Sequence, residues 1–396
     1  MLKGMYSYFF MAILEFTRGL ADRIFCNIFM SVIKLLAPGN RYNKKGSLYL
    51  RSNMYPFLRD LLFNFDAEGV HHFSMNTFQT LNKWPFLHRV LAQQFGFEHH
   101  KLQKKYFGIY FPNPVGLGAG FDKNAVYLKE LETLGFGFVE IGTVTPLPQN
   151  GNDAPRLFRL PKDKALVNRM GFNNDGVKII ANRLRQRTTN IIVGGNIGKN
   201  KITPNEDAWK DYEKCYLGLF DCVDYFVINV SSPNTPGLRE LQEKSSLQKI
   251  FGQLQNINQG QIKPKPLLLK IAPDLTIGQV DDIIELAIEM KLSGLVATNT
   301  TISREGLLTP ASELEKIGTG GLSGRPLTKR SLEIVKYIHQ QTAGKLPIIA
   351  SGGIFTGEDA EKQLNAGASL VQVWTGFVYE GPCIVKNICQ FLVKEY

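Results

Sequence analysis

The sequence predicts an α/β protein of the TIM (β/α)8 barrel class with a small helical layer before the barrel. Eight short apolar runs alternate with amphipathic segments from about residue 110 to the end of the 396-residue chain. A cluster of polar residues follows each run. The hydrophobic fraction of 44% and the charged fraction of 20% are those of a globular chain and exclude a disordered or fibrous protein.

The apolar runs are short enough to be buried parallel strands. An open, doubly wound sheet is the alternative arrangement, but eight regular β-then-α units favour closure into a barrel. We predict strands over the following residues: 114–119, 138–144, 190–197, 225–231, 266–272, 294–300, 346–352 and 369–375.

Two of the intervening segments carry signals for the start of a helix. Segment 276–291 begins with Thr276 and has Gln279 three residues later, a capping-box pattern. Segment 356–366 begins with Thr356 and has Asp359 at the same spacing. Both are predicted to be helices that cover the barrel.

The chain before the barrel divides into two parts, which gives three domains with the barrel itself at 98–396. Residues 54–97 are predicted to be helical, because apolar side chains recur at helical spacing. Their aromatic stripe fits either packing on the barrel or a greasy patch in a membrane interface. Residues 1–53 carry eight of the basic residues and two acids, and fit either a transit peptide or a start-site extension.

Charge and cysteine content narrow the class of protein further. The net charge is +11, and residues 1–53 account for +6 of it, so the remaining chain is only mildly basic. An anionic membrane surface fits this distribution better than a nucleic acid does. The five cysteines form no CxxC pair, so we expect neither a disulfide framework nor a metal site. No apolar stretch reaches the ~18–20 residues of a spanning helix.

The polar clusters predict where the active site lies, because TIM barrels build it at the carboxyl ends of their strands. Gly352 and Gly353 follow a predicted strand and precede a predicted helix start, a turn that presents backbone N–H groups to an anion. With the GGLSG segment at 320–324, this indicates a phosphate site. No GxGxxG segment opens a βαβ unit, so a flavin mononucleotide or a sugar phosphate fits better than a nicotinamide.

Cations and amides gather at the same ends. Lys123 and Lys270 can balance negative charge on a reduced ring or on a substrate. Converging amides suit a planar ring of alternating C=O and N–H groups, such as a pyrimidine. The five amides are Asn168, Asn196, Asn229, Asn234 and Asn299.

The acid–base residue is predicted by elimination. Five of the six histidines precede the first predicted strand and His339 falls in a predicted helix, and no cysteine lies in a strand-end cluster. Ser232, in the loop SSPNTPGLREL, is the best candidate for the base, although a serine needs neighbours that relay its proton. The prolines and the glycine of this loop suit a lid.

Together these motifs resemble one family. The segments AGFDK, EIGTVTP, NRMGFNN, NIGKNK, NVSSPNTPGL, KIAPDL, TNTT, GGLSGRPL and GASLVQVW occur in order and in every strand-end loop. The chain resembles the class 2, quinone-dependent dihydroorotate dehydrogenases over roughly residues 54–396.

The resemblance implies an FMN enzyme of de novo pyrimidine (UMP) biosynthesis that oxidises dihydroorotate to orotate. Ser232 would take the C5 proton, with Lys123 as a second catalytic residue and Thr235 nearby. One FMN would be bound by Ala119, Gly120, Thr143, Asn196, Asn229, Lys270, Thr298, Gly324, Gly353, Trp374 and Thr375. The substrate would be held by Lys123, Asn168, Gly171, Phe172, Asn229, Asn234, Asn299 and Thr300.

The resemblance also gives the helical layer a role. A quinone would enter through it near His71 and Arg159, so the aromatic stripe becomes a quinone tunnel. A monomer bound peripherally to the inner membrane, bacterial or mitochondrial, is implied. The family usually has tyrosine where this chain has Trp374, so the side chain near the quinone end differs.

Two other interpretations remain open from the residues alone. A flavin barrel that reduces uridine in RNA fits the basic isoelectric point, but no basic RNA-binding appendage or site cysteine is present. A non-catalytic barrel that binds phosphate and serves as a membrane scaffold would be colourless.

Overall fold

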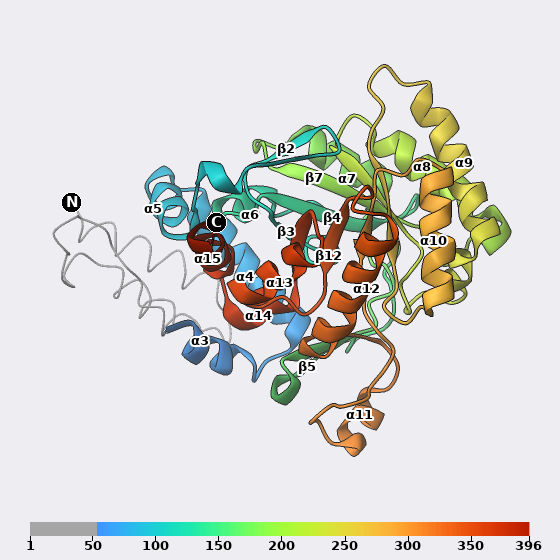
Figure 1. The fold of residues 1–396 in the computed structure, drawn as a ribbon. Helices are drawn as coiled ribbons and strands as arrows, with labels where there is room; N and C mark the ends of the chain where they lie inside the picture. The colour runs from blue at the N-terminus through green and yellow to red at the C-terminus, as the bar shows by residue number, and fades with distance from the viewer. Residues whose placement is uncertain (1–53, 396) are drawn as a thin grey trace. The chain divides into compact units, whose positions relative to one another are not determined.

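The fold is seen in a computed structural model that describes residues 54–395 (Figure 1). The predicted extension at 1–53 lies outside the described residues. From Tyr55 onward the chain forms one compact unit, so the helical layer and the barrel pack together.

Eight parallel strands close into a barrel, which confirms the predicted TIM fold and excludes the open sheet. Each strand pairs with the next around the ring, and the last pairs with the first through Val371 and Val115. The strands, in order around the barrel, are β3 (Val115–Leu117), β4 (Phe138–Val144), β7 (Ile192–Ile197), β8 (Tyr225–Asn229), β9 (Leu267–Ile271), β10 (Gly294–Ala297), β12 (Ile348–Ser351) and β13 (Leu370–Val373).

An antiparallel hairpin closes the amino-terminal end of the barrel, and the sequence did not predict it. It consists of β1 (Lys104–Tyr106) and β2 (Ile109–Phe111). Phe111 is buried against Phe138 of β4, with ring centroids 5.3 Å apart. Because this end is filled by apolar side chains, ligands must enter at the opposite end, where the polar residues lie.

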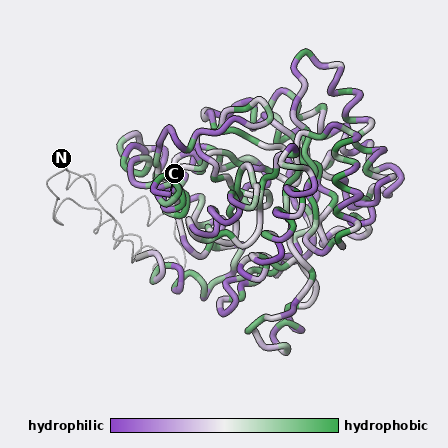
Figure 2. The backbone as a smooth tube through the Cα atoms, in the orientation of Figure 1, coloured by the Kyte–Doolittle hydropathy of each residue, from purple (hydrophilic) through white to green (hydrophobic). Residues whose placement is uncertain are grey.

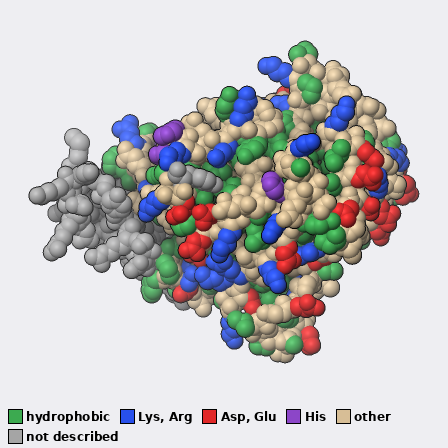
Figure 3. Space-filling view, viewed as in Figure 1, with side chains coloured by type: hydrophobic (Ala, Val, Ile, Leu, Met, Phe, Trp, Pro, Cys, Tyr) green, Lys and Arg blue, Asp and Glu red, His purple; other side chains and the backbone are tan. Residues whose placement is uncertain are grey.

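Helices surround the strands (Figure 1), and hydrophobic and hydrophilic residues alternate along them (Figure 2). The buried residues of these helices are mostly apolar. Both predicted capping boxes are present, at Thr276 with Gln279 and at Thr356 with Asp359. Acidic and basic side chains lie together on the surface over α9 (Lys244–Gln259) and α10 (Ile277–Glu289) (Figure 3). Lys244 and Glu285 form an ion pair between these two helices at 2.6 Å. The helices that follow the hairpin are α6 (Leu128–Thr133), α7 (Val177–Arg185), α8 (Ala208–Leu219), α9 (Lys244–Gln259), α10 (Ile277–Glu289), α11 (Ala311–Ile317), α12 (Thr328–Gln341), α13 (Gly357–Asn365), α14 (Thr375–Glu380) and α15 (Ile384–Glu395).

A three-stranded antiparallel sheet lies outside the barrel and was also not predicted. It has the order β11 (Gly321–Gly324), β6 (Ala165–Asn168), β5 (Leu157–Leu160). The GGLSG segment, predicted as a phosphate loop, is therefore largely an edge strand that pairs with β6. This pairing brings Gly324 and Asn168 to the same cavity.

The helical layer consists of α3 (Met54–Leu62), α4 (Ala67–Asn82) and α5 (Pro85–Phe95), as the apolar spacing predicted. Tyr55 donates a hydrogen bond to the carbonyl of Val378 at 2.6 Å, and Gln79 donates to that of Val126 at 3.1 Å. The layer leaves large aromatic side chains exposed, including Phe57 (79%) and Phe86 (75%). Among the described residues, no helix has the length and apolarity needed to cross a membrane.

Candidate active site

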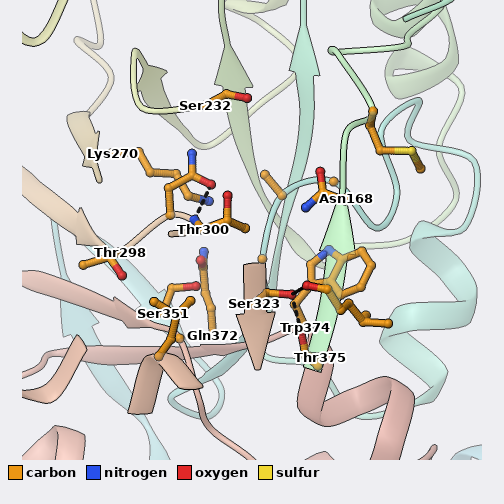
Figure 4. A pocket seen from close by; sticks show the side chains of 18 of the residues that line it. Asn168, Ser232, Lys270, Thr298, Thr300, Ser323, Ser351, Gln372, Trp374 and Thr375 are labelled. Carbon is orange, nitrogen blue, oxygen red and sulfur yellow. Dashed lines mark hydrogen bonds between the residues drawn. The ribbon is translucent and has the colours of Figure 1, made fainter. Parts of the chain in front are cut away.

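One cavity at the carboxyl ends of the barrel strands collects nearly all of the predicted site residues. Ser232, Asn168 and Thr300 lie toward one end of it, and Ser323, Ser351 and Thr375 lie toward the other (Figure 4). The predicted residues on its wall are Ala119, Gly120, Lys123, Thr143, Asn168, Gly171, Phe172, Asn229, Ser232, Asn234, Lys270, Thr298, Asn299, Thr300, Gly324, Gly353, Trp374 and Thr375. Asn196 is fully buried behind this wall.

Two glycines at one end of the cavity cannot be replaced without a clash. Gly353 has φ +72°, and a Cβ there would lie 2.6 Å from the backbone nitrogen of Thr328. Gly324 has φ +103°, and its Cβ would lie 2.3 Å from the carbonyl oxygen of Lys164. Glycine lets the chain take these positive φ angles and pack closely against Thr328 and Lys164. Both turns lie on the cavity wall, where backbone N–H groups can bind a phosphate.

The same cavity holds buried polar atoms that lack a partner within residues 54–395. These are the hydroxyl oxygen of Thr298 and the amide oxygen Oε1 of Gln372. A buried acceptor without a donor costs free energy, so both atoms indicate that a polar ligand completes the site. The narrow glycine turns and these atoms together fit a flavin nucleotide.

Beneath the cavity lies a carboxylate that the sequence analysis missed. Glu140, on β4, is fully buried and accepts hydrogen bonds from three side chains. Its donors are Lys270 Nζ at 3.0 Å, Asn196 Nδ2 at 2.7 Å and Gln372 Nε2 at 2.6 Å. Lys270 is therefore one half of a buried ion pair as well as part of the wall.

The predicted amides form a connected chain. Thr143 Oγ1 donates to Asn196 Oδ1 at 2.5 Å and accepts from Asn229 Nδ2 at 2.8 Å. Asn299 Nδ2 lies 2.9 Å from Ser231 Oγ and 3.3 Å from Asn229 Oδ1. The side chains are thus held in place before any ligand binds.

Asn168 and Asn234 form a second amide pair across the cavity. Asn234 Nδ2 donates to Asn168 Oδ1 at 3.0 Å, which links the loop after β8 to the outer sheet. In the same loop, Ser232 is 6% exposed, and its Oγ accepts from the backbone nitrogen of Asn234 at 3.3 Å. The predicted base therefore lies at the cavity and away from bulk water.

Arg239 holds the neighbouring loops together, and the sequence analysis did not identify it. It donates to the carbonyls of Ser231 at 3.1 Å and Thr300 at 3.0 Å, and it pairs with Asp274 at 2.8 Å. Its sequence signal is only a charge that follows a Pro- and Gly-rich loop.

Lys123 lies where the first cavity meets a second one. Burial lowers the pKa of its ammonium to about 8, and the charge of Glu68 opposes this shift. Glu68 itself is bound by Arg156 at 2.8 and 2.9 Å, and this ion pair lowers the pKa of the Glu68 carboxyl. A lysine whose pKa lies well below the ordinary value, and which still carries its charge at pH 7, is thus placed at the boundary of the two cavities.

The second cavity has a volume of about 390 Å³ and lies between the helical layer and the barrel. His71 and Arg159, predicted for the quinone, both line it. Burial lowers the pKa of His71 to about 3, so its imidazole is neutral at physiological pH. Arg159 stacks over Phe63, with the guanidinium carbon 4.7 Å from the ring centroid.

Trp374 forms part of the wall between the two cavities and lines both of them. Its ring centroid lies 5.8 Å from that of Phe121, in an edge-to-face arrangement. Gly120, Lys123, Leu157, Leu166 and Met170 also line both cavities, so the two spaces share one wall.

Comparison with known protein families shows which family this chain belongs to. The family model described as Dihydroorotate dehydrogenase matches residues 101–395. This chain belongs to the dihydroorotate dehydrogenase family. The match confirms the family expected from the strand-end motifs.

Relatives and solved structures of the dihydroorotate dehydrogenase family cover most of this chain. The dihydroorotate dehydrogenase (quinone) of Christiangramia forsetii is 53% identical over 338 residues, which are 85% of this chain and 98% of the relative. That of Gloeobacter violaceus is 48% identical over 348 residues, which are 87% and 95%. A crystal structure of DHODH in complex with ferulenol from Eimeria tenella is 40% identical, with a TM-score of 0.70, and covers 78% of this chain and 89% of that one.

Proposed function

We propose that this protein is a dihydroorotate:quinone oxidoreductase that forms orotate for de novo pyrimidine biosynthesis, with FMN as its cofactor. The observation that carries the proposal is that Lys123, Ser232 and the asparagine amides converge on one cavity. The relatives named as quinone enzymes, which align with most of the chain, support the same activity.

The residues of the cavity divide between cofactor and substrate. The glycine turns at Gly324 and Gly353, with Thr375, would hold the phosphate. Thr298, Lys270 and Gln372 would face the flavin ring. The amides Asn168, Asn229, Asn234 and Asn299 would pair with the C=O and N–H groups of dihydroorotate, and Lys123 would balance its carboxylate.

When bound, FMN would supply the acceptor for the C6 hydride of dihydroorotate and the source of electrons for the quinone. Ser232 would remove the C5 proton as the C5–C6 double bond of orotate forms. A hydroxyl is a weak base, so its small exposure and the surrounding polar loop support a relay through neighbouring groups and not direct contact with bulk water.

The second cavity would admit the quinone. Its lining is largely apolar, and His71 and Arg159 are among the polar side chains on its wall. The exposed aromatic side chains of the helical layer support peripheral association with the inner membrane from which a quinone would enter.

The activity is tested by following orotate formation from dihydroorotate with a short-chain quinone and FMN-loaded protein. We expect Ser232→Ala to keep its flavin and to reduce it at least a hundredfold more slowly, the usual size of a general-base contribution. Ser246→Ala, a half-buried serine on α9, is the matched control and should behave as wild type.

Stopped-flow absorbance of the flavin measures the reduction rate directly. A yellow protein that forms no orotate would reject the proposed activity. A Ser232→Ala rate equal to that of wild type would remove Ser232 as the base and leave the activity intact.

A further inference from the structure

Glu140 lies at the centre of the hydrogen bonds beneath the cavity, although it does not touch the cavity itself. Its side chain is fully buried on β4. It accepts from Lys270, Asn196 and Gln372, which belong to three other strands of the barrel, β9, β7 and β13.

An ionised carboxylate only accepts hydrogen bonds, and this fixes how each neighbouring amide is turned. Gln372 must direct Nε2 toward Glu140, and it does so at 2.6 Å. Its other end, Oε1, therefore points away and has no partner among the described residues. Gln372 is one of the residues that line the cavity, so the buried Oε1 is an unpaired acceptor next to the cavity wall.

The hydrogen bond to Glu140 also determines how the neighbouring asparagine amides are oriented. Asn196 directs Nδ2 to Glu140, so its Oδ1 accepts from Thr143 Oγ1 and from Asn229 Nδ2. Asn229 then turns its own Oδ1 to Ser231 and Asn299. Each of these linked amides has one orientation that satisfies its neighbours. Because Glu140 can only accept, it determines the orientation of Asn196, and Asn196 determines that of Asn229.

We propose that Glu140 is a positioning residue that sets the donor and acceptor pattern of the flavin site and tunes the reduction potential of the bound flavin. This inference rests on the proposed function, because it concerns the flavin. The acceptor on Gln372 suits the imide N–H of an isoalloxazine ring. The buried negative charge of Glu140 also offsets Lys270 and disfavours the negative charge that a flavin gains on reduction.

The test is Glu140→Gln in the flavin-loaded enzyme. Lys270 would hold the oxygen of the new amide, so Asn196 would keep its acceptor. The amide nitrogen would then face Gln372, which must flip and offer the cavity Nε2 in place of Oε1. We expect the flavin to dissociate at least tenfold faster, measured by recovery of free flavin fluorescence on dilution.

The loss of charge has a second readout. At a fixed potential, the ratio of reduced to oxidised flavin should rise about tenfold, which is a positive shift of about 30 mV for a two-electron couple. The orotate dissociation constant, read from the flavin absorbance, should stay within threefold of wild type, because the Asn196 arm is unchanged.

Two further variants keep the result interpretable. Glu130→Gln changes another buried carboxylate that accepts from an amide, Asn82 Nδ2 at 3.3 Å, outside the cavity, and should match wild type. Gln372→Met removes both ends of this amide, the acceptor Oε1 and the donor to Glu140, and leaves the charge of Glu140 in place. It should also speed flavin loss at least tenfold, and it decides the matter if Glu140→Gln does not fold.

Wild-type flavin retention and potential in Glu140→Gln would overturn the inference, as would an orotate affinity that falls as much as flavin retention does. Wild-type retention in Gln372→Met would remove the acceptor from the argument. A wild-type protein that binds neither flavin nor orotate would instead reject the proposed function.

Discussion

Lys123 is a cation that can bind an anionic ligand over only part of the pH range. Burial lowers the pKa of its ammonium to about 8, so the free protein carries this charge at pH 7 and has largely lost it at pH 9. An anionic substrate needs the charge. Substrate affinity should therefore depend on pH in a range where an ordinary lysine would not titrate.

We expect the orotate dissociation constant to rise about tenfold between pH 7 and pH 9, because the protonated fraction of Lys123 falls by that factor. Titration of the flavin absorbance with orotate measures it. Lys123→Arg keeps its charge throughout and should bind with little pH dependence over this range. A rise of equal size in Lys123→Arg would assign the titration to another group.

The residues that line the first cavity were largely predictable, since strand-end polar clusters meet at one end of a barrel. Glu140 was not, because its three partners are 56, 130 and 232 residues away in sequence. A single acid inside an apolar run gives no sign of whether it faces the barrel interior or a covering helix. Only closure of the ring brings its partners to it.

Among the elements, α13 begins just after the glycine turn at Gly352 and Gly353, which follows strand β12. Thr356 caps this helix, and Asp359 accepts from the backbone nitrogens of Phe355 and Thr356 and from Arg325, which follows Gly324. The cap therefore holds both glycine segments of the proposed phosphate site, whereas the equivalent cap of α10 at Thr276 holds none.

Thr356→Ala and Thr276→Ala should each lower the free energy of unfolding by about 1 kcal/mol, the usual contribution of such a cap. Urea denaturation measures this cost. Only Thr356→Ala should also speed flavin dissociation, by several-fold. Equal flavin loss in both variants would show that α13 has no special relation to the cofactor.

The barrel strands and both capping boxes were predicted correctly because their signals are local. The outer sheet was not, since β5, β6 and β11 are four-residue strands and β11 pairs with residues more than 150 positions earlier. The glycines of β11 have the same sequence signature whether they form a loop or an edge strand. Non-local pairing decided between them.

At the scale of the whole molecule, the helical layer has exposed aromatic side chains on its outside and borders a cavity on its inside. Phe57 and Phe86 are more than 70% exposed, whereas Leu58 and Leu62 of the same layer line the cavity. Transfer of exposed aromatic side chains from water into a membrane interface lowers the free energy. The surface that would bind lipid therefore adjoins the passage that would admit a quinone.

The double variant Phe57→Ser/Phe86→Ser should bind vesicles at least tenfold more weakly in a sedimentation assay. Its turnover with a long-chain quinone in vesicles should fall, whereas that with a water-soluble acceptor should not. Leu308→Ser, at a residue that is 71% exposed outside the layer, is the matched control. Equal vesicle binding by wild type and the double variant would contradict membrane docking by these side chains.

The wall that contains Trp374 and Lys123 has a kinetic consequence. Because each reactant would keep its own compartment, neither must leave before the other arrives, and only electrons have to cross the partition. Inhibitors that fill the apolar side should therefore leave the affinity for orotate unchanged. A polar inhibitor in the first cavity and an apolar inhibitor in the second should bind the same molecule at the same time.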